Sequence, residues 1–284
     1  MPELPEVESI RNQLSLFLIG HKIEKIVVHL LKTFPEGKEK IVGGKIKKVR
    51  RFGKVLVIDL DNEFSLIIHV KMTGQLIYKG PNIKHKQNLS KKVLGGIPGK
   101  HTHVIFELDK EGYLFFNDVR KFGWIKVVKN SDVERSKFIV TLGAEPLKDL
   151  TLQKFVEILS LSKKPVKLLL MDQEKISGIG NIYANDALWL AKIHPKRESL
   201  GISSSGRKDL LNAIETVLKK GIEKGGSSEV SYVKPDGGEG KYQHFTLAYG
   251  KVGQLCKRCR RAKINKIKLG GRGTYFCPFC QKLI

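Results

Sequence analysis

Four cysteines in two closely spaced pairs have the clearest capacity for chemistry in this sequence. Cys256 and Cys259 form one CxxC pair, Cys277 and Cys280 form a second, and residues 260–276 lie between them. Two such pairs can hold Zn²⁺ tetrahedrally through four thiolates and leave no coordination position open. The pattern therefore predicts one zinc ion with a structural role. Two disulfides or four unrelated thiols are the alternatives, and disulfides do not suit an intracellular chain of this size.

Positive charge dominates the composition. The chain has 52 Lys and Arg against 28 Asp and Glu, which gives a formal net charge of +24. Such an excess favours a polyanionic partner, because neutralising nucleic-acid phosphates releases condensed counterions. Ribosomal or membrane-surface attraction is the alternative that charge alone leaves open. Basic residues are dense around the cysteine pairs, which predicts a zinc finger that touches DNA: Lys257, Arg258, Arg260, Arg261, Lys263, Lys266, Lys268 and Arg272.

Nothing in the sequence indicates a membrane. No apolar run reaches the roughly 18 residues of a membrane span. The N-terminus carries Glu3, Glu6 and Glu8 and lacks the cationic and apolar regions of a signal peptide. We therefore expect a cytoplasmic, nucleoid-associated protein without a membrane partner.

The first half of the chain predicts one helix followed by strands. Apolar residues recur at helical spacing from Glu6 to Leu18, with Pro5 in the first turn and Gly20 at the end. From Lys22 to about Val128 short β-rich runs alternate with turns, which favours an antiparallel sandwich or barrel. The clearest strands are Val55–Ile58, Phe64–Ile68, Val104–Phe106 and Tyr113–Phe116.

The second half of the chain is helical. The expected helices run from a Thr151 cap to Leu161, from Pro165, from Asn181 towards Pro195, and from about Arg207 to Lys220. Six glycines between Gly225 and Gly240 predict a mobile loop rather than a domain.

Seven short motifs occur in an order that resembles the formamidopyrimidine-DNA glycosylase (Fpg/MutM) family over essentially the whole chain. They are Pro2–Glu8, Arg51–Lys54, His69–Met72, Lys100–His103, Arg120–Gly123, Gly178–Ala184 and the zinc finger. The resemblance implies an α+β multidomain fold. Its expected domains are an N-terminal helix with an antiparallel β-sandwich (1–130), a helix–two-turn–helix domain with a lesion-capping loop (131–249), and a C-terminal β-hairpin zinc finger (250–284).

The resemblance also implies an activity. The family excises oxidised purines, 8-oxoguanine and formamidopyrimidines, from damaged double-stranded DNA through a Schiff base on its N-terminal proline, followed by β,δ-elimination. Removal of Met1 would free Pro2 as a secondary amine, with an ordinary pKa near 7.7–8.0. Glu3 matches the family's acid/base residue, Glu6 its supporting carboxylate and Lys54 its active-site lysine.

Further matches concern DNA contacts. Chemistry at C1′ requires the nucleotide to leave the stack, and Met72, Arg120 and Phe122 match the residues that fill the gap. Core packing is the alternative for Met72 and Phe122. His69 and His101 match residues near the DNA backbone. The matched phosphate contacts are Lys167, Asn181, Tyr249 and Arg272. Arg272 is also counted among the catalytic residues that the resemblance implies. Asn181 stands at an expected helix N-terminus, which favours phosphate, with a simple cap as the alternative. The loop that folds over the flipped base corresponds to residues 225–240, with Ser227, Ser228 and Tyr232.

Two other functions remain open. An endonuclease VIII-type glycosylase would prefer oxidised pyrimidines, although Leu4, Met72 and the Arg120/Phe122 pair favour the purine branch. A non-catalytic zinc-ribbon protein would need only the charge and the finger. One active site per chain suggests a monomer. The Lys-rich loop 79–101 has no assignment beyond non-specific attraction to the DNA backbone.

Overall fold

Helix α1 (Leu4–Leu18) opens the first of two units into which this computed structural model divides. The structure describes residues 1–84 and 87–283, so Lys86 and Ile284 lie outside the described residues. The N-terminal unit comprises Met1–Val140 and Ile222–Gln243, and the C-terminal unit comprises Thr141–Gly221 and His244–Ile284. This division differs from the three expected segments, because residues 222–243 pack with the sandwich and the zinc finger packs with the helices.

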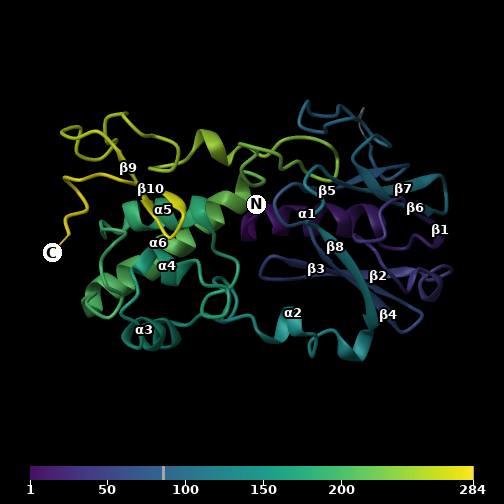
Figure 1. The fold of residues 1–284 in the computed structure, drawn as a ribbon, viewed down its shortest axis with the longest axis horizontal. Helices are drawn as coiled ribbons and strands as arrows, with labels where there is room; N and C mark the ends of the chain where they lie inside the picture. The colour runs from purple at the N-terminus through teal and green to yellow at the C-terminus, as the bar shows by residue number, and fades with distance from the viewer. Residues whose placement is uncertain (85–86, 284) are drawn as a thin grey trace. The chain divides into compact units, whose positions relative to one another are not determined.

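The N-terminal unit is an antiparallel β-sandwich, as the sequence predicted (Figure 1). One sheet has the order β1 (Ile23–Val28), β6 (Thr102–Leu108), β7 (Gly112–Asp118) and β5 (Gly74–Lys79). The other has the order β2 (Ile46–Phe52), β3 (Val55–Leu60), β4 (Phe64–His69) and β8 (Trp124–Lys129). The short elements of this part are η1 (Lys38–Lys40), η2 (Asn130–Asp132) and α2 (Lys137–Val140).

Helix α1 contacts strands of both sheets: β2 and β3 of one, and β5 of the other. Its Leu14 is fully buried in one core with Leu56 and Phe116 from the two sheets. Burial of each such side chain contributes about 1.5–3 kcal/mol, so the apolar face of α1 is fixed firmly against the sandwich. The beginning of the chain is thereby held in one place.

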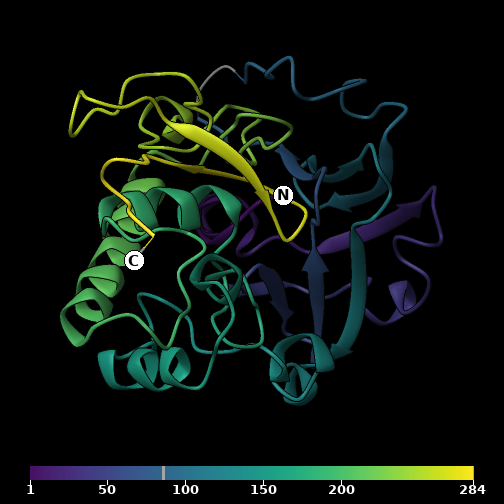
Figure 2. The same ribbon diagram turned by 60° about the vertical axis from the view of Figure 1, so that its left-hand side comes forward.

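The C-terminal unit joins helices to a β-hairpin. The helices are α3 (Leu152–Ser160), α4 (Val166–Leu170), α5 (Asn181–Leu190) and α6 (Ser204–Glu223), whose last residues pass into the N-terminal unit. A 3₁₀ turn, η3 (Tyr242–His244), and the hairpin β9 (Asn265–Leu269)–β10 (Arg272–Phe276) follow. Figure 2 shows the yellow hairpin alongside the helices, where β10 contacts α5.

The helix termini agree closely with the sequence signals. The Thr151 hydroxyl accepts a hydrogen bond from the Lys154 N–H at 3.3 Å, which caps α3. Helix α4 follows Pro165 directly, and α5 begins at Asn181. Helix α5 ends at Leu190, before Pro195. None of the helices in the described residues has the length and apolar character of a membrane span.

The segment 225–240 contains no helix or strand, as predicted, but it is not an open loop. Ser228 and Val233 are buried, at 0% and 1% exposure. The Tyr78 N–H of β5 donates to the Pro235 carbonyl at 2.9 Å. The segment is therefore packed onto the sheet, and we call it the capping loop below.

Candidate active site and nucleic-acid interface

The N-terminal residues form a buried carboxylate cluster. Pro2 is buried, and Glu3 and Glu6 are 3% and 1% exposed. Oε2 of Glu6 accepts from the Glu3 N–H at 2.8 Å, and Oε1 accepts from the Ser227 N–H of the capping loop at 2.7 Å. Glu6 thus fixes both the backbone beside Pro2 and the start of the capping loop.

The capping loop approaches Glu6 closely. Gly226 has φ +80°, and a Cβ atom there would lie 2.8 Å from Cγ of Glu6, so only glycine fits. The Tyr232 hydroxyl donates to the Gly225 carbonyl at 3.1 Å, and burial raises the pKa of Tyr232 well above its ordinary value. Tyr232 belongs to the main core, so its place is beneath the loop rather than on its surface.

Lys54 and His69 lie close to each other in the sandwich. Lys54 stands in the tight turn between β2 and β3 and is only 5% exposed. His69 ends β4, and burial, with the charges of Lys71 and Lys54, lowers the pKa of its ring to about 3. Nδ1 of His69 accepts from the Lys71 N–H at 2.9 Å. His69 is therefore neutral at pH 7 with its proton on Nε2, a hydrogen-bond donor rather than a cation.

Three residues matched to the gap-filling role meet in space. The Arg120 guanidinium donates to Sδ of Met72 at 2.9 Å and stands 4.8 Å from the centre of the Phe122 ring. Phe122 is 49% exposed, and Arg120 is also exposed. The core-packing alternative for Phe122 is wrong, because its ring reaches solvent next to a cation.

Asp118 holds the turn that carries these side chains, and sequence reasoning missed it. Its Oδ2 accepts from the N–H groups of Phe122 and Gly123 at 2.8 and 2.7 Å. Its Oδ1 accepts from the Arg120 N–H at 3.1 Å and from the Thr73 hydroxyl. The carboxylate is 1% exposed, and it joins the turn after β7 to the start of β5. An Asp shortly before a turn is a common signal for such bonds to backbone N–H groups.

The two histidines before and within β6 differ in their surroundings. His101 is half-buried, and its carbonyl accepts from the Asp118 N–H at 2.9 Å. His103 is 5% exposed, and its Nε2 lies 2.7 Å from the Asp118 carbonyl. Both therefore support the backbone at Asp118, while the His101 ring retains partial access to solvent.

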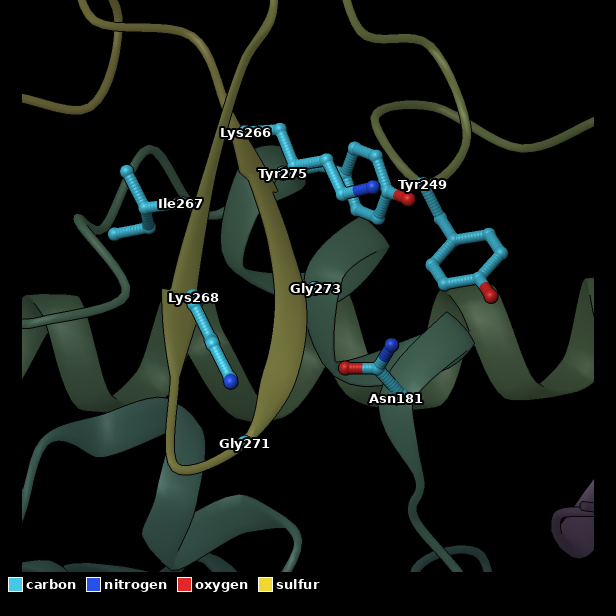
Figure 3. A pocket seen from close by; sticks show the side chains of 8 residues that line it. All are labelled: Asn181, Tyr249, Lys266, Ile267, Lys268, Gly271, Gly273 and Tyr275. Carbon is cyan, nitrogen blue, oxygen red and sulfur yellow. The ribbon is translucent and has the colours of Figure 1, made fainter.

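The C-terminal unit has a polar pocket of about 470 Å³ between α5 and the hairpin (Figure 3). Asn181 and Tyr249, both predicted, line it together with Tyr275. The other lining residues come from the two strands and their turn: Lys266, Ile267, Lys268, Gly271 and Gly273. The positive end of the α5 dipole and the ammonium groups of Lys266 and Lys268 meet here, so the pocket suits an anion.

Lys167 lies beneath this hairpin and not on the surface. It is 0% exposed, and its Nζ donates to the Gly273 carbonyl at 3.0 Å and to the Thr274 hydroxyl at 2.7 Å. The structure therefore does not present Lys167 to a phosphate. Arg272, at the start of β10, is exposed, as a phosphate contact requires.

The four cysteine sulfurs converge on one point. All four Sγ atoms lie within 4.8 Å of one another, which matches a tetrahedral four-thiolate zinc site. The closest pairs are Cys259–Cys277 at 3.7 Å and Cys256–Cys280 at 3.9 Å, far beyond the roughly 2.05 Å of a disulfide. The disulfide alternative is wrong. Hydrogen bonding from the Arg261 N–H lowers the pKa of Cys259 to about 6, whereas burial raises that of Cys277 to about 12, so the convergence of the four sulfurs carries the assignment and bound metal would deprotonate the thiols. The chain holds one structural zinc ion.

Family models match three parts of the chain in succession. They are the N-terminal domain of formamidopyrimidine-DNA glycosylase at residues 1–125, its H2TH domain at residues 142–232, and the zinc finger found in FPG and IleRS at residues 253–283. The first two models together cover most of the chain, and the third covers the four cysteines.

Individual relatives match from end to end. Formamidopyrimidine-DNA glycosylase of Pelotomaculum thermopropionicum is 39% identical and is covered over 100% of both chains. The Streptococcus mutans protein of the same name is 37% identical over 99% of this chain and 100% of its own. The solved structure of Lactococcus lactis Fpg with DNA containing an abasic site superposes with a TM-score of 0.85 at 35% identity, covering 99% of each chain. A mutant of that protein with Fapy-dG DNA gives 0.86, covering 99% of this chain and 100% of its own. These matches confirm the resemblance, and the chain belongs to the formamidopyrimidine-DNA glycosylase family.

Proposed function

We propose that this chain is a bifunctional DNA glycosylase and abasic-site lyase of base excision repair, which removes 8-oxoguanine and formamidopyrimidines from duplex DNA. The observation that carries the proposal is the buried cluster of Pro2, Glu3 and Glu6, closed by the Ser227 N–H. Glu3 and Glu6 also form the capping box of α1, a structural role that a non-catalytic protein could share. What favours catalysis is that they stand directly after Pro2 within the part of the chain that matches the N-terminal domain of formamidopyrimidine-DNA glycosylase.

The chemistry begins once Met1 is removed. The neutral amine of Pro2 attacks C1′ and loses its N–H proton, the bond from C1′ to the base breaks with its electron pair on the base, and the base takes up a proton. Glu3 protonates the ring oxygen, which opens the deoxyribose and leaves an iminium ion. A secondary amine gives an iminium with no N–H proton to lose, so it remains an electron sink. Loss of a proton from C2′ then expels the 3′ phosphate, loss of a proton from C4′ expels the 5′ phosphate, and water hydrolyses the iminium and releases Pro2.

The lesion base requires a pocket outside the stack. The Ser227 hydroxyl is buried and has no hydrogen-bond partner among the described residues. An unsatisfied buried hydroxyl costs about 1–3 kcal/mol, which a bound polar base would recover. This atom lies on the capping loop beside Glu6, which supports the loop's proposed role over the everted base.

Eversion leaves a gap that Met72, Arg120 and Phe122 fill. Their mutual contacts and the exposure of Phe122 support this role. We expect Phe122→Ala to slow single-turnover excision from duplex DNA by about tenfold or more, because nothing then holds the opened stack. Arg120→Ala should relax discrimination among opposite bases, since a guanidinium can read a base edge.

Val119→Ala is the matched control for the Phe122 experiment. Val119 is 39% exposed on the same turn and has no proposed contact with DNA. Zinc content and thermal unfolding should be unchanged in both variants. An excision rate for Phe122→Ala equal to that of the wild type would refute the proposed role of Phe122 in filling the gap.

The pocket in the C-terminal unit is proposed to bind backbone phosphate. Asn181 and Tyr249 line it and supply contacts, and Lys266 and Lys268 supply charge. Arg272, exposed at the start of β10, is proposed to contact phosphate on the same hairpin. Lys167 acts there as a positioning residue, because its ammonium holds the backbone of β10. His69 and His101 are proposed to lie near the DNA backbone, with neutral His69 donating through Nε2.

Borohydride trapping separates the candidate functions. Protein lacking Met1 should form a covalent adduct with duplex DNA containing 8-oxoguanine, faster than with an oxidised pyrimidine and not at all with undamaged duplex. The reverse preference would indicate an endonuclease VIII-type enzyme, and binding without an adduct would indicate a non-catalytic protein. We also propose that the chain acts as a monomer on chromosomal DNA, since each chain carries one complete cluster.

A further inference from the structure

A short segment between β5 and β6 lies on the capping loop. We call residues 87–93 the strap; they belong to the Lys-rich loop (blue beside β5 in Figure 1). The Ser90 N–H donates to the Gly237 carbonyl at 2.9 Å. The Gln87 amide donates to the carbonyls of Asp236 and Tyr78, at 3.2 and 2.8 Å. The strap therefore binds the backbone of the loop and of β5 together.

Apolar contacts reinforce this attachment. Val93 of the strap packs with Ile77 of β5 and Val233 of the capping loop, and all three are buried. A Cβ atom on Gly237 would lie 2.4 Å from Cδ2 of Leu89, so Leu89 rests directly on the loop backbone. Ile77, Val93 and Val233 therefore form a small hydrophobic core between the strap, β5 and the capping loop.

Lys92 joins the two ends of the capping loop. Its Nζ donates to Oε2 of Glu239 at 2.6 Å and also to the Ser228 carbonyl. Oε1 of Glu239 accepts from the Ser90 hydroxyl at 2.6 Å. The side chains of Lys92 and Glu239 are 28% and 40% exposed, so solvent screens the ion pair and its Coulombic attraction alone stabilises little. Its importance lies in the geometry that it imposes on Ser228.

Ser228 directly follows Ser227, the residue whose N–H binds Glu6 in the candidate active site. Its N–H donates to Oε1 of Gln243 at 3.0 Å, and its hydroxyl accepts from the Gly240 N–H at 2.8 Å. The preceding N–H, that of Ser227, binds Glu6. A displacement of the Ser228 carbonyl would therefore shift the neighbouring Ser227 N–H, which donates to the Glu6 carboxylate.

We propose that Lys92 and Glu239 are positioning residues that order the capping loop before DNA binds. The inference rests on the proposed function, because it concerns the loop that covers the everted base. A loop ordered in advance loses less conformational entropy when the base enters. We call the pair of Lys92 and Glu239 the clasp. Elimination at an abasic site has no base to cover, so the clasp should matter for base excision and not for the lyase step.

The test substitutes Lys92→Met, which keeps the side-chain length and removes the charge. Hydrogen exchange of the amides in residues 226–241 of the free protein should quicken by about tenfold, since opening of the loop becomes easier. Single-turnover excision of 8-oxoguanine should slow by a similar factor, about tenfold. Cleavage of a preformed abasic site should match that of the control variant. Lys92→Arg keeps the cation and should recover most of both losses.

Lys91→Met is the matched control, because Lys91 is the exposed neighbour and the variant loses the same charge. Any change shared by the two variants reflects weaker attraction to DNA. Equal exchange and equal excision in the two variants would overturn the clasp, as would an equal slowing of base excision and the lyase step by Lys92→Met. A wild-type protein that excises no base would defeat the proposed function instead, and hydrogen exchange would still decide whether Lys92 orders the loop.

Discussion

Protein that retains Met1 is expected to form no borohydride-trapped adduct with DNA and to have no lyase activity above background, a loss on the order of 10³-fold or more. While Met1 is attached, the nitrogen of Pro2 is a tertiary amide. Its lone pair is delocalised into the carbonyl, and it has no proton to lose on attack. Active preparations should show Pro2 as the first residue by N-terminal mass analysis, and the adduct should map to that residue.

Pro2→Gly provides a second measurement on the same nitrogen. It leaves a primary amine after processing, and its imine can lose a proton, so the lyase step should be impaired while zinc content stays the same. Glu3 and Glu6 remain buried in either variant, because helix α1 holds them. Full activity from protein proven to keep Met1 would exclude Pro2 and make Lys54, buried near His69, the next amine to test.

Cys277→Ser should abolish zinc binding and weaken binding to duplex DNA by about 100-fold or more, because the loss of several phosphate contacts acts multiplicatively. The metal closes the segment that carries the hairpin, and Arg272 and Lys268 stand on that hairpin. Zinc content by elemental analysis and affinity for lesion-containing duplex at fixed salt are the measurements. The unfolding transition of the β-sandwich should persist, since its core contains none of these residues.

Leu283→Ala is a suitable control for the cysteine variant. Leu283 is 60% exposed near the same knuckle and contributes no metal ligand. It should bind zinc and DNA as the wild type does. Normal affinity of metal-free Cys277→Ser for lesion DNA would mean that the finger does not contact the duplex.

Local patterns predicted the helices better than the strands. Helices α3, α4 and α5 begin where Thr151, Pro165 and Asn181 indicated, because caps act within one turn. Strand β2 was not singled out, although Ile46 and Val49 are both buried. These two residues are three apart because the pairing of β2 with β3 shifts near Ile46, so the alternation expected of a strand is interrupted. Strand β1 has the same irregularity in its pairing with β6.

The site residues were predicted by motif, but their supports were not. Asp118 accepts from backbone N–H groups through its carboxylate, and Ser227, expected only as part of the loop over the flipped base, donates its own N–H to Glu6. These partners depend on tertiary contacts that no local pattern encodes. Lys167 was expected at a phosphate and is buried under the hairpin. Its position within the apolar turn of α4, between Val166 and Leu169, is the signal that could have indicated burial.

The attachment of the hairpin to the helices makes the finger inseparable from its neighbours. The Asn185 Oδ1 of α5 accepts from the Tyr275 N–H at 2.7 Å, and the ammonium of Lys167 donates to two groups of β10. The Gln281 amide, next to the last cysteine, donates to the Ile193 carbonyl at 2.8 Å. Deletion of residues 250–284 would remove these hydrogen-bond partners of Lys167, Asn185 and Ile193. The zinc finger is therefore not a transplantable cassette, and a graft would have to carry α4 and α5 with it.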